Sequence, residues 1–207
     1  MADEGSLATA RKLIRAEGQA VISAADGIGE PFLAALALLA NCKKKVLVTA
    51  VGTSGTIARR LAHLLASGCG MSAFYFHPGE ALHGPSAMVE EGDLLIAISK
   101  GGKSAELNQF LGIARERGGK VISLTSSPGS DMAAQSDIVL EVPVNPAAED
   151  EGILPFGSTL TTAAIGDALT YLVRRMRGFD LGEMRQTHPS GATADVVAQM
   201  KNRTGEE

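Results

Sequence analysis

The sequence has 207 residues, of which 45% are hydrophobic and 20% are charged, and its formal net charge is −4. That length favours one domain with a substantial core over two full domains. The mildly acidic balance and the absence of tryptophan argue against a broad nucleic-acid surface, which needs a basic face or aromatic rings on which bases stack.

The chain offers no sequence signal for secretion, membrane insertion or metal binding. Residues 1–15 are mixed and charged, and the longest apolar stretch, 31–40, is too short to span a bilayer. Cys42 and Cys69 stand far apart, without a CxxC pair or a histidine at ligand spacing. We therefore expect a cytoplasmic protein with reduced thiols, no metal site and no membrane or nucleic-acid partner.

Helical spacing of apolar residues marks the N-terminal part of the chain. Residues 7–40 predict two helices, separated near Gly27 and Gly29. We divide the chain into N-terminal helices that pack on the domain, the domain itself and a C-terminal tail, at residues 1–44, 45–192 and 193–207. All three parts are expected to form one structural unit.

The central part alternates short apolar runs with helical stripes. The runs are rich in Val, Ile and Leu and cover residues 46–51, 73–76, 94–98, 121–125 and 138–142. Runs of this kind are typical of parallel strands that helices cover on both faces, with right-handed crossovers between them. We therefore predict an α/β fold, a flavodoxin-like three-layer α-β-α sandwich around a five-stranded parallel sheet.

A long apolar helix is expected at residues 158–177, before a polar tail. Its apolar stripe is wider than one sheet face needs and comprises Leu160, Ala164, Leu172 and Met176, with Ile165, Leu169 and Val173 beside them. Two interpretations fit this width: burial on two sides, as at a subunit interface, or ordinary core packing.

The loops after the strands hold the candidate binding residues, because ligands of open parallel sheets bind beyond the carboxyl ends of the strands. The first loop leads into a helix and contains Gly52, Thr53 and Ser54. Its glycines let the backbone approach an anion, and hydroxyls and the helix N-terminus supply donors. It matches neither a Walker A loop nor a dinucleotide-binding GxGxxG. A plain N-cap turn is the competing interpretation.

The loop after the third strand is the stronger phosphate-binding candidate. It brings hydroxyls, glycines and lysines to a helix N-terminus, and its candidate ligands are Ser99, Lys100, Gly101, Gly102 and Ser104. Glu106 follows in the first helical turn, where it either complements the helix dipole or carries a proton. Thr125 opens a similar, weaker loop after the fourth strand. One site built from all of these loops is the economical interpretation.

Histidines flanked by proline and glycine add further candidates. His77 and His83 follow the second strand, and His188 comes after the long helix. A lone histidine is more often structural than catalytic, but exposed loops are where functional residues concentrate. We therefore retain His83 and His188 as candidates.

These motifs together resemble the arabinose-5-phosphate isomerases of the SIS (sugar isomerase) superfamily. In chain order they are VGTSG at 51–55, HPGEALHG at 77–84, AISKGGKSAE at 97–106, GDAL at 166–169 and HPSG at 188–191. The resemblance implies an α-β-α sandwich that assembles as a homo-oligomer, a tetramer or a dimer. It also implies interconversion of D-ribulose 5-phosphate and D-arabinose 5-phosphate through an enediol, without an organic cofactor.

By position, the resemblance places three residues in the active site and three on the phosphate-binding loops: His83, Glu106 and His188, and Ser54, Ser99 and Ser104. Moving a proton between two carbons needs a base close to them and a second group at the oxygens. We assign His188 as the base, Glu106 as its partner or substitute, and His83 to ring opening or hydroxyl positioning.

The sequence departs from the family pattern at three places. The family usually has a lysine at Thr53, an asparagine–serine pair at Lys100–Gly101 and a glutamate at Ala147. The lysines of the second glycine loop can supply the missing positive charge, and either Glu149 or Glu151 can replace the glutamate. Many members also carry tandem regulatory CBS domains after the SIS domain, which these 207 residues do not contain.

Two other functions stay open at this point. The departures fit an isomerase of another sugar phosphate, such as a hexulose, heptulose or sugar-acid phosphate. SIS domains also serve as non-catalytic phosphosugar sensors, often fused to a helix-turn-helix module, for which the residues before the domain are too few and insufficiently basic. A nucleotide- or flavin-binding domain lacks its expected loop.

Overall fold

The computed structural model describes residues 3–187, 190–192, 194–196 and 199. Within these residues, one five-stranded parallel sheet forms in the order β2-β1-β3-β4-β5. Its strands are β1 (Val46–Thr49), β2 (Ala73–Tyr75), β3 (Leu94–Ile98), β4 (Lys120–Thr125) and β5 (Ile138–Glu141). The α/β fold expected from the sequence is confirmed, and every strand overlaps the apolar run that predicted it.

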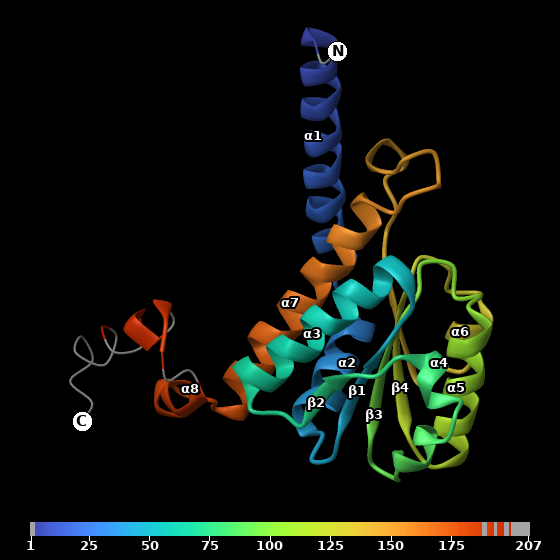
Figure 1. Ribbon diagram of the computed structural model, residues 1–207, viewed down its shortest axis with the longest axis vertical. Helices are drawn as coiled ribbons and strands as arrows, with labels where there is room; N and C mark the ends of the chain where they lie inside the picture. Colours follow the sequence, from blue (N-terminus) through green and yellow to red (C-terminus); the bar gives the residue numbers. More distant parts are fainter. Residues whose placement is uncertain (1–2, 188–189, 193, 197–198, 200–207) are drawn as a thin grey trace.

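Helices cover both faces of this sheet (Figure 1). One face carries α2 (Glu30–Asn41), α3 (Gly52–Cys69) and α7 (Gly157–Arg177), and the last turns of α1 (Glu4–Asp26) pack against α7. The other face carries α4 (Pro78–Ala81), α5 (Ala105–Glu116) and α6 (Asp131–Ala134). The remaining described elements are two short 3-10 turns and a helix, η1 (Pro85–Met88), η2 (Pro146–Ala148) and α8 (Leu181–Thr187).

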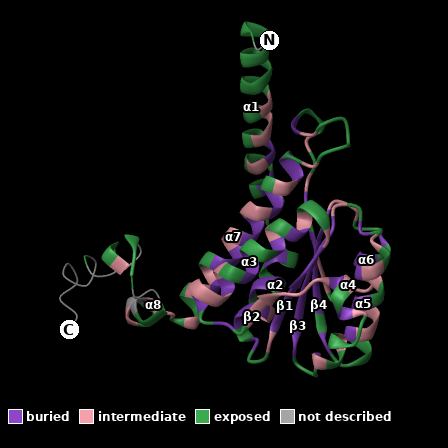
Figure 2. Cartoon of the chain, in the orientation of Figure 1, coloured by how far each residue is buried: buried purple, intermediate pink, exposed green. Residues whose placement is uncertain are grey.

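Alternate side chains of each strand enter separate apolar cores on the two faces. In β1, Val46 and Val48 pack with α2, α3 and α7, whereas Leu47 packs with α5. All five residues of β3 are buried in the same alternating way. Figure 2 shows the sheet as the buried centre of the molecule. Because apolar burial is the dominant favourable term in folding, this two-sided core holds the sheet in place.

The strand order creates a switch point between β1 and β3. The helix after β1, α3, crosses one face of the sheet, and the helix after β3, α5, crosses the other. The loops that lead to these helices therefore diverge beyond the carboxyl ends of the two strands. Open α/β sheets bind their ligands in the crevice that this divergence leaves.

The long helix α7 buries one side within this chain. Ile165, Leu169 and Val173 enter the core, whereas Leu160 and Met176 are 43% and 58% exposed. The wide apolar stripe expected from the sequence is thus only partly covered, and its second side faces outward.

Helix α1 projects beyond the rest of the fold (Figure 1). Ala20 and Ala24 are its buried residues, while Leu7, Ile14 and Ile22 are exposed. Over the described part of the chain, no single helix is both long and apolar enough to cross a membrane; α1 and α2 reach that length and hydropathy only together, across a bend of 84°.

Asp93 ties together the amino ends of β1 and β3, at the opposite end of these strands from the switch-point loops. Its fully buried carboxylate accepts the backbone N–H groups of Lys45 at 3.1 Å and of Glu90 at 2.8 Å. The Lys45 ammonium lies 3.1 Å from the same carboxylate. A buried carboxylate is tolerated when it is paired and hydrogen-bonded in this way. Asp93 therefore fixes the relative position of the two strands whose loops diverge.

Replacing Asp93 with Ala should lower the free energy of unfolding by about 3 kcal/mol, because two backbone N–H groups and one ammonium lose their acceptor. Urea denaturation followed by circular dichroism measures this change. Glu116→Ala removes an exposed carboxylate from α5 and is the matched control, with an expected change below about 0.5 kcal/mol. A loss in Asp93→Ala no larger than that of the control would contradict the role given to Asp93.

Candidate functional site

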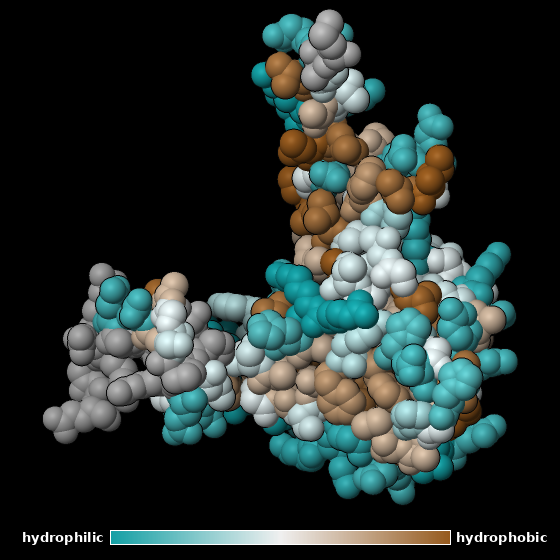
Figure 3. Space-filling view, in the orientation of Figure 1, coloured by the Kyte–Doolittle hydropathy of each residue, from teal (hydrophilic) through white to brown (hydrophobic). Residues whose placement is uncertain are grey.

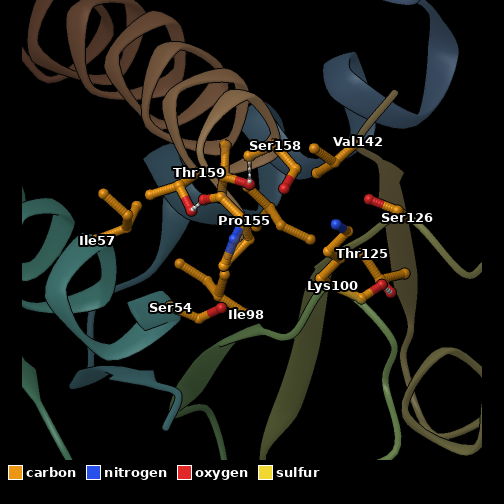
Figure 4. Close-up of a pocket in the computed structure, with 12 residues that line it drawn as sticks. Ser54, Ile57, Ile98, Lys100, Thr125, Ser126, Val142, Pro155, Ser158 and Thr159 are labelled. Carbon is orange, nitrogen blue, oxygen red and sulfur yellow. Dashed lines mark hydrogen bonds between the residues drawn. The ribbon is translucent and has the colours of Figure 1, made fainter. Parts of the chain in front are cut away.

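A pocket opens at the carboxyl ends of the strands, beside the N-terminus of α7 (Figure 4). Residues following or ending β1, β3, β4 and β5 meet there with the first turns of α7: Ser54, Ile57, Ile98, Lys100, Leu124, Thr125, Ser126, Val142, Pro155, Ser158, Thr159 and Thr162. Apolar side chains, hydroxyl groups and one lysine make up this lining. Apolar side chains with convergent polar groups among them are typical of a small-molecule site.

Helix α3 begins directly at the glycine that follows β1. Gly52 has a φ of 58°, a left-handed conformation that glycine adopts without a Cβ clash. Val51 occupies the N-cap position and makes no side-chain hydrogen bond to the first turn, so the serine or threonine N-cap considered for this loop is not formed. The first N–H groups of the helix are left for a ligand or for solvent. Ser54 lines the pocket, while Thr53 is exposed.

The loop after β3 is held against the loop after β4. Ser99 Oγ accepts the N–H of Gly102 at 3.1 Å. The Lys100 carbonyl accepts the N–H of Ser126 at 3.0 Å and the hydroxyl of Thr125 at 3.1 Å. Gly102 has a φ of 63°, and a Cβ there would overlap a serine side chain of the next loop. The backbone around Lys100 is thus well defined by hydrogen bonds and close packing.

Lys100 is held by an almost fully buried carboxylate. Its Nζ lies 2.7 Å from Glu149 Oε2, and Glu149 Oε1 accepts the backbone N–H of Ser158, also at 2.7 Å. Burial by itself raises the pKa of Glu149, but the hydrogen bonds from Lys100 and Ser158 outweigh it and hold the pKa below its ordinary value of 4.5. Glu149 is therefore charged at neutral pH and links the loop after β3 to the N-terminus of α7.

Of the two glutamates that could replace the family glutamate, Glu149 is the one that contacts the lysine of the pocket. Glu151 is exposed and has a φ of 47°, in a turn that leads away from the carboxyl ends of the strands. Ala147, at the aligned position, is also exposed. The contact with Lys100 therefore favours Glu149 as the acidic group of the site.

Two serine hydroxyls in the pocket wall, Ser126 Oγ and Ser158 Oγ, are buried. Ser126 Oγ has no hydrogen-bond partner within the described part of the chain, whereas the Ser158 hydroxyl acts on Glu149 and helps to lower its pKa. Both serines flank Lys100 in Figure 4. A buried hydroxyl without a partner costs free energy, so such groups are expected to hydrogen-bond to a ligand or to ordered water.

The predicted phosphate ligands divide into two groups. Ser54, Lys100 and Thr125 line the pocket. The others lie on the loops that adjoin it, namely Gly52, Thr53, Ser99, Gly101, Gly102 and Ser104. The structure therefore brings three separate loops of the prediction to one place and leaves the binding role of each residue as a prediction.

The residues predicted to move protons are not gathered at this pocket. Glu106, in the first turn of α5, is partly exposed, and His83 is exposed in the turn after α4. Neither of them lines the pocket, and His188 lies outside the described residues. His77 caps α4 through its Nδ1, which accepts the N–H of Gly79 at 3.1 Å, and this is a structural role. The catalytic assignments stay predictions.

Sequence reasoning missed the contribution of α7 to the pocket. Ser158, Thr159 and Thr162 come from its first turns and line the wall together with Pro155. A signal was present, because hydroxyl residues are concentrated where this helix begins. The apolar stripe of this helix predicts only its burial, because no local pattern indicates that its N-terminus reaches the sheet edge.

Both cysteines are buried and unpaired. Burial raises the pKa of the Cys69 thiol to about 11, so the reactive thiolate is scarce at neutral pH. In the residues that the structure describes, no group of three or more His, Cys, Asp or Glu side chains is placed to hold a metal ion. The polar groups that the pocket offers to a ligand are therefore hydroxyls, backbone N–H groups and the Lys100–Glu149 pair.

Comparison with known proteins finds matches to one domain family, to curated relatives and to solved structures. Residues 38–172 match the SIS domain family. The chain is 32% identical to arabinose 5-phosphate isomerase GutQ of Escherichia coli (strain K12) and 34% identical to arabinose 5-phosphate isomerase KdsD of Pseudomonas aeruginosa. These alignments cover 91% and 89% of this chain, which spans 59% and 56% of the two relatives. A solved structure of an Escherichia coli CFT073 protein in complex with arabinose 5-phosphate has a TM-score of 0.85 and 31% identity, over 91% of this chain and 100% of that one.

Replacing Glu149 with Gln should make the free energy of unfolding depend less steeply on pH below about pH 4.5. Because the folded state lowers the pKa of Glu149 below 4.5, the unfolded chain takes up this proton first as the pH falls. The stability from this group is therefore present above about pH 4.5 and is lost as the pH falls through the folded-state pKa. Urea denaturation at a series of pH values measures the slope.

Glutamine keeps an acceptor for the Ser158 N–H but does not titrate, which isolates the charge of Glu149. Glu116→Gln, on the exposed surface of α5, is the control and should keep the wild-type slope. An unchanged slope in Glu149→Gln would mean that this carboxylate does not titrate differently in the folded and unfolded states.

Proposed function

The chain belongs to the SIS domain family, and within it we propose that the protein is an aldose–ketose isomerase of a phosphorylated sugar. The similarity to arabinose 5-phosphate isomerases along most of the chain is the observation that supports this best. We infer that its substrate pair is D-ribulose 5-phosphate and D-arabinose 5-phosphate. The position of the pocket at the switch point agrees with a site for a small anionic ligand.

In the proposed complex, the phosphate binds where the first turn of α3 meets the loop after β3. The free N–H groups and positive dipole end of a helix favour an anion there. Ser54 and Lys100, which line the pocket, add a hydroxyl and a positive charge. Clamping the phosphate end orients C1 and C2 of the open-chain sugar and so lowers the entropic barrier to proton transfer.

The proposed chemistry opens the sugar ring and then moves a proton between C1 and C2 through an enediol. A base must lie within hydrogen-bond reach of these carbons, and a second group must handle the proton on the oxygens. We assign His188 as the base, Glu106 as its partner or substitute, and His83 to ring opening or hydroxyl positioning.

We further infer that the protein assembles as a homo-oligomer through α1 and α7. Leu7, Ile14 and Ile22 are exposed at helical spacing on α1, away from its buried alanines, and Leu160 and Met176 are exposed on α7. Figure 3 shows apolar surface along the projecting part of α1. Exposed apolar residues gathered on one side of a helix mark an interaction surface, and a second copy covers the stripe symmetrically because it carries the same surface.

We expect the protein to convert D-ribulose 5-phosphate in deuterated water into arabinose 5-phosphate that carries deuterium at C2. A base removes a proton from C1 of the ketose to form the enediol, and that base can exchange the proton with the solvent before it delivers one to C2. Proton NMR at C1 and C2 follows both product and label. Turnover of another sugar phosphate would keep the reaction and change the substrate, whereas binding without turnover of any would favour a phosphosugar sensor.

The same assay tests the proton carriers. Glu106→Gln and His188→Ala should each lower kcat by about a hundredfold while the affinity for substrate changes little, because general acid–base catalysis contributes on that scale. Gln109, an exposed residue on the same helix as Glu106, provides the matched control as Gln109→Ala. Equal losses in kcat and in affinity would contradict a role in proton transfer.

Replacing Ile14 and Ile22 together with Glu should lower the molecular mass of the assembly in sedimentation-velocity experiments. Two buried charges in an apolar interface are strongly unfavourable, so association should weaken by at least about a hundredfold. Gln19→Glu places a charge at an exposed position of the same helix and should leave the assembly intact. An unchanged mass for the double variant would exclude α1 from the interface.

A further inference from the structure

Lys100 is the charged residue among those that line the pocket in the described part of the chain. Its side chain is 35% exposed, and it is held in place by one carboxylate, that of Glu149. The ammonium of a lysine ends a flexible four-carbon stem and can change partner without any movement of the backbone. The backbone of Lys100, by contrast, is fixed by its carbonyl hydrogen bonds to the loop after β4.

Glu149 is much less free to move than its partner. Its side chain is 4% exposed, and its second oxygen accepts the N–H of Ser158 at the start of α7. A helix N-terminus stabilises a carboxylate through its free N–H groups and dipole, independently of the lysine. Glu149 therefore keeps one strong interaction if Lys100 turns away from it.

The pocket wall beside this pair holds two buried serine hydroxyls. Ser126 Oγ has no hydrogen-bond partner in the described residues, whereas the Ser158 hydroxyl, on a residue that is only 3% exposed, acts on Glu149 and helps to lower its pKa. Two hydroxyls and one ammonium in the same pocket suit a ligand that offers several acceptor oxygens at once. A phosphate monoester has this chemistry, because it presents three acceptor oxygens and up to two negative charges.

We propose that Lys100 exchanges Glu149 for the phosphate of the substrate, so that ligand binding replaces an internal ion pair with an ion pair to the ligand. This inference rests on the proposed function, since it takes the pocket as the phosphate site. It assigns two distinct roles: Lys100 is the cation that recognises the anion, and Glu149 is the competitor that holds Lys100 while the pocket is empty.

Exchange, rather than addition of the phosphate to the existing pair, follows from the electrostatics of the pocket. A phosphate placed beside an anchored carboxylate would bring two anions together where screening by water is weak. Rotation of Lys100 toward the ligand keeps the ammonium paired with a negative charge. Glu149 remains bound to the N-terminus of α7 through Ser158.

The two roles predict opposite effects on the dissociation constant of inorganic phosphate, measured by isothermal titration calorimetry. Lys100→Met should weaken binding by about tenfold to a hundredfold, the range expected for loss of a hydrogen bond to a charged group. Glu149→Gln should tighten it severalfold, because the neutral amide still accepts the Ser158 N–H but no longer competes for the ammonium. Lys43→Met removes an exposed lysine before β1 and should leave the constant unchanged.

A double variant keeps the inference testable if Lys100→Met by itself does not fold. Lys100→Met alone leaves Glu149 buried without its counter-charge, which is destabilising, whereas Lys100→Met with Glu149→Gln removes both charges together. This double variant should bind phosphate at least about tenfold more weakly than Glu149→Gln, in which Lys100 is free. Thermal unfolding of each variant confirms that the comparison is made between folded proteins.

Three results would overturn the inference. Equal phosphate affinity of the double variant and Glu149→Gln would show that Lys100 does not bind the anion. Weaker binding by Glu149→Gln than by the wild type would show that Glu149 positions Lys100 and does not compete for it. Isomerase activity of the wild type alongside either result would leave the proposed function standing, while a wild type that binds neither inorganic phosphate nor arabinose 5-phosphate would contradict both.

Discussion

A parallel sheet that is buried on both faces leaves only its two ends for chemistry. Here the inner residues of β1 and β3 enter apolar cores on alternate sides, so a polar group within these strands would lie away from water. All the strands point in one direction, and their carboxyl ends therefore meet at one edge. Loops that are far apart in the sequence converge there, and this convergence produces the pocket.

Helix α7 connects this pocket to the rest of the core. Its N-terminus donates the Ser158 N–H to Glu149, and its middle part packs into the core through Leu169. Near its end, Arg177 donates hydrogen bonds to the carbonyls of Ala40 and Cys42 at 3.2 and 3.1 Å, which ties it to the end of α2. The same helix therefore forms a wall of the pocket and part of one layer of the sandwich. Packing of its middle part into the core fixes the position of that wall.

The positive charge of the pocket comes from the loop after β3. Thr53, on the loop after β1, is exposed and uncharged, while Lys100 lines the pocket. A lysine at this position is within reach of the buried Glu149 carboxylate. Binding of an anion is then a competition between two partners for one ammonium, rather than attraction to a free charge.

The sequence alone determined the layers of the fold and the loops that could bind an anion. Apolar runs and helical stripes are local patterns, and they located the strands and α7 because burial of each element depends on its own periodicity. Glycines and hydroxyls after β1 and β3 could likewise be recognised locally, since the conformation of such loops depends on neighbouring residues.

Only the tertiary structure decided which charged groups meet. Lys100 and Glu149 are 49 positions apart, and neither periodicity nor loop composition indicates that their side chains pair. The same holds for Ser158, whose place in the pocket depends on how α7 crosses the sheet. Which sides of α1 and α7 stay exposed was also undecided, because an apolar stripe specifies that a surface should be buried but not what covers it. Contacts of this kind depend on the path of the whole chain, which no local pattern encodes.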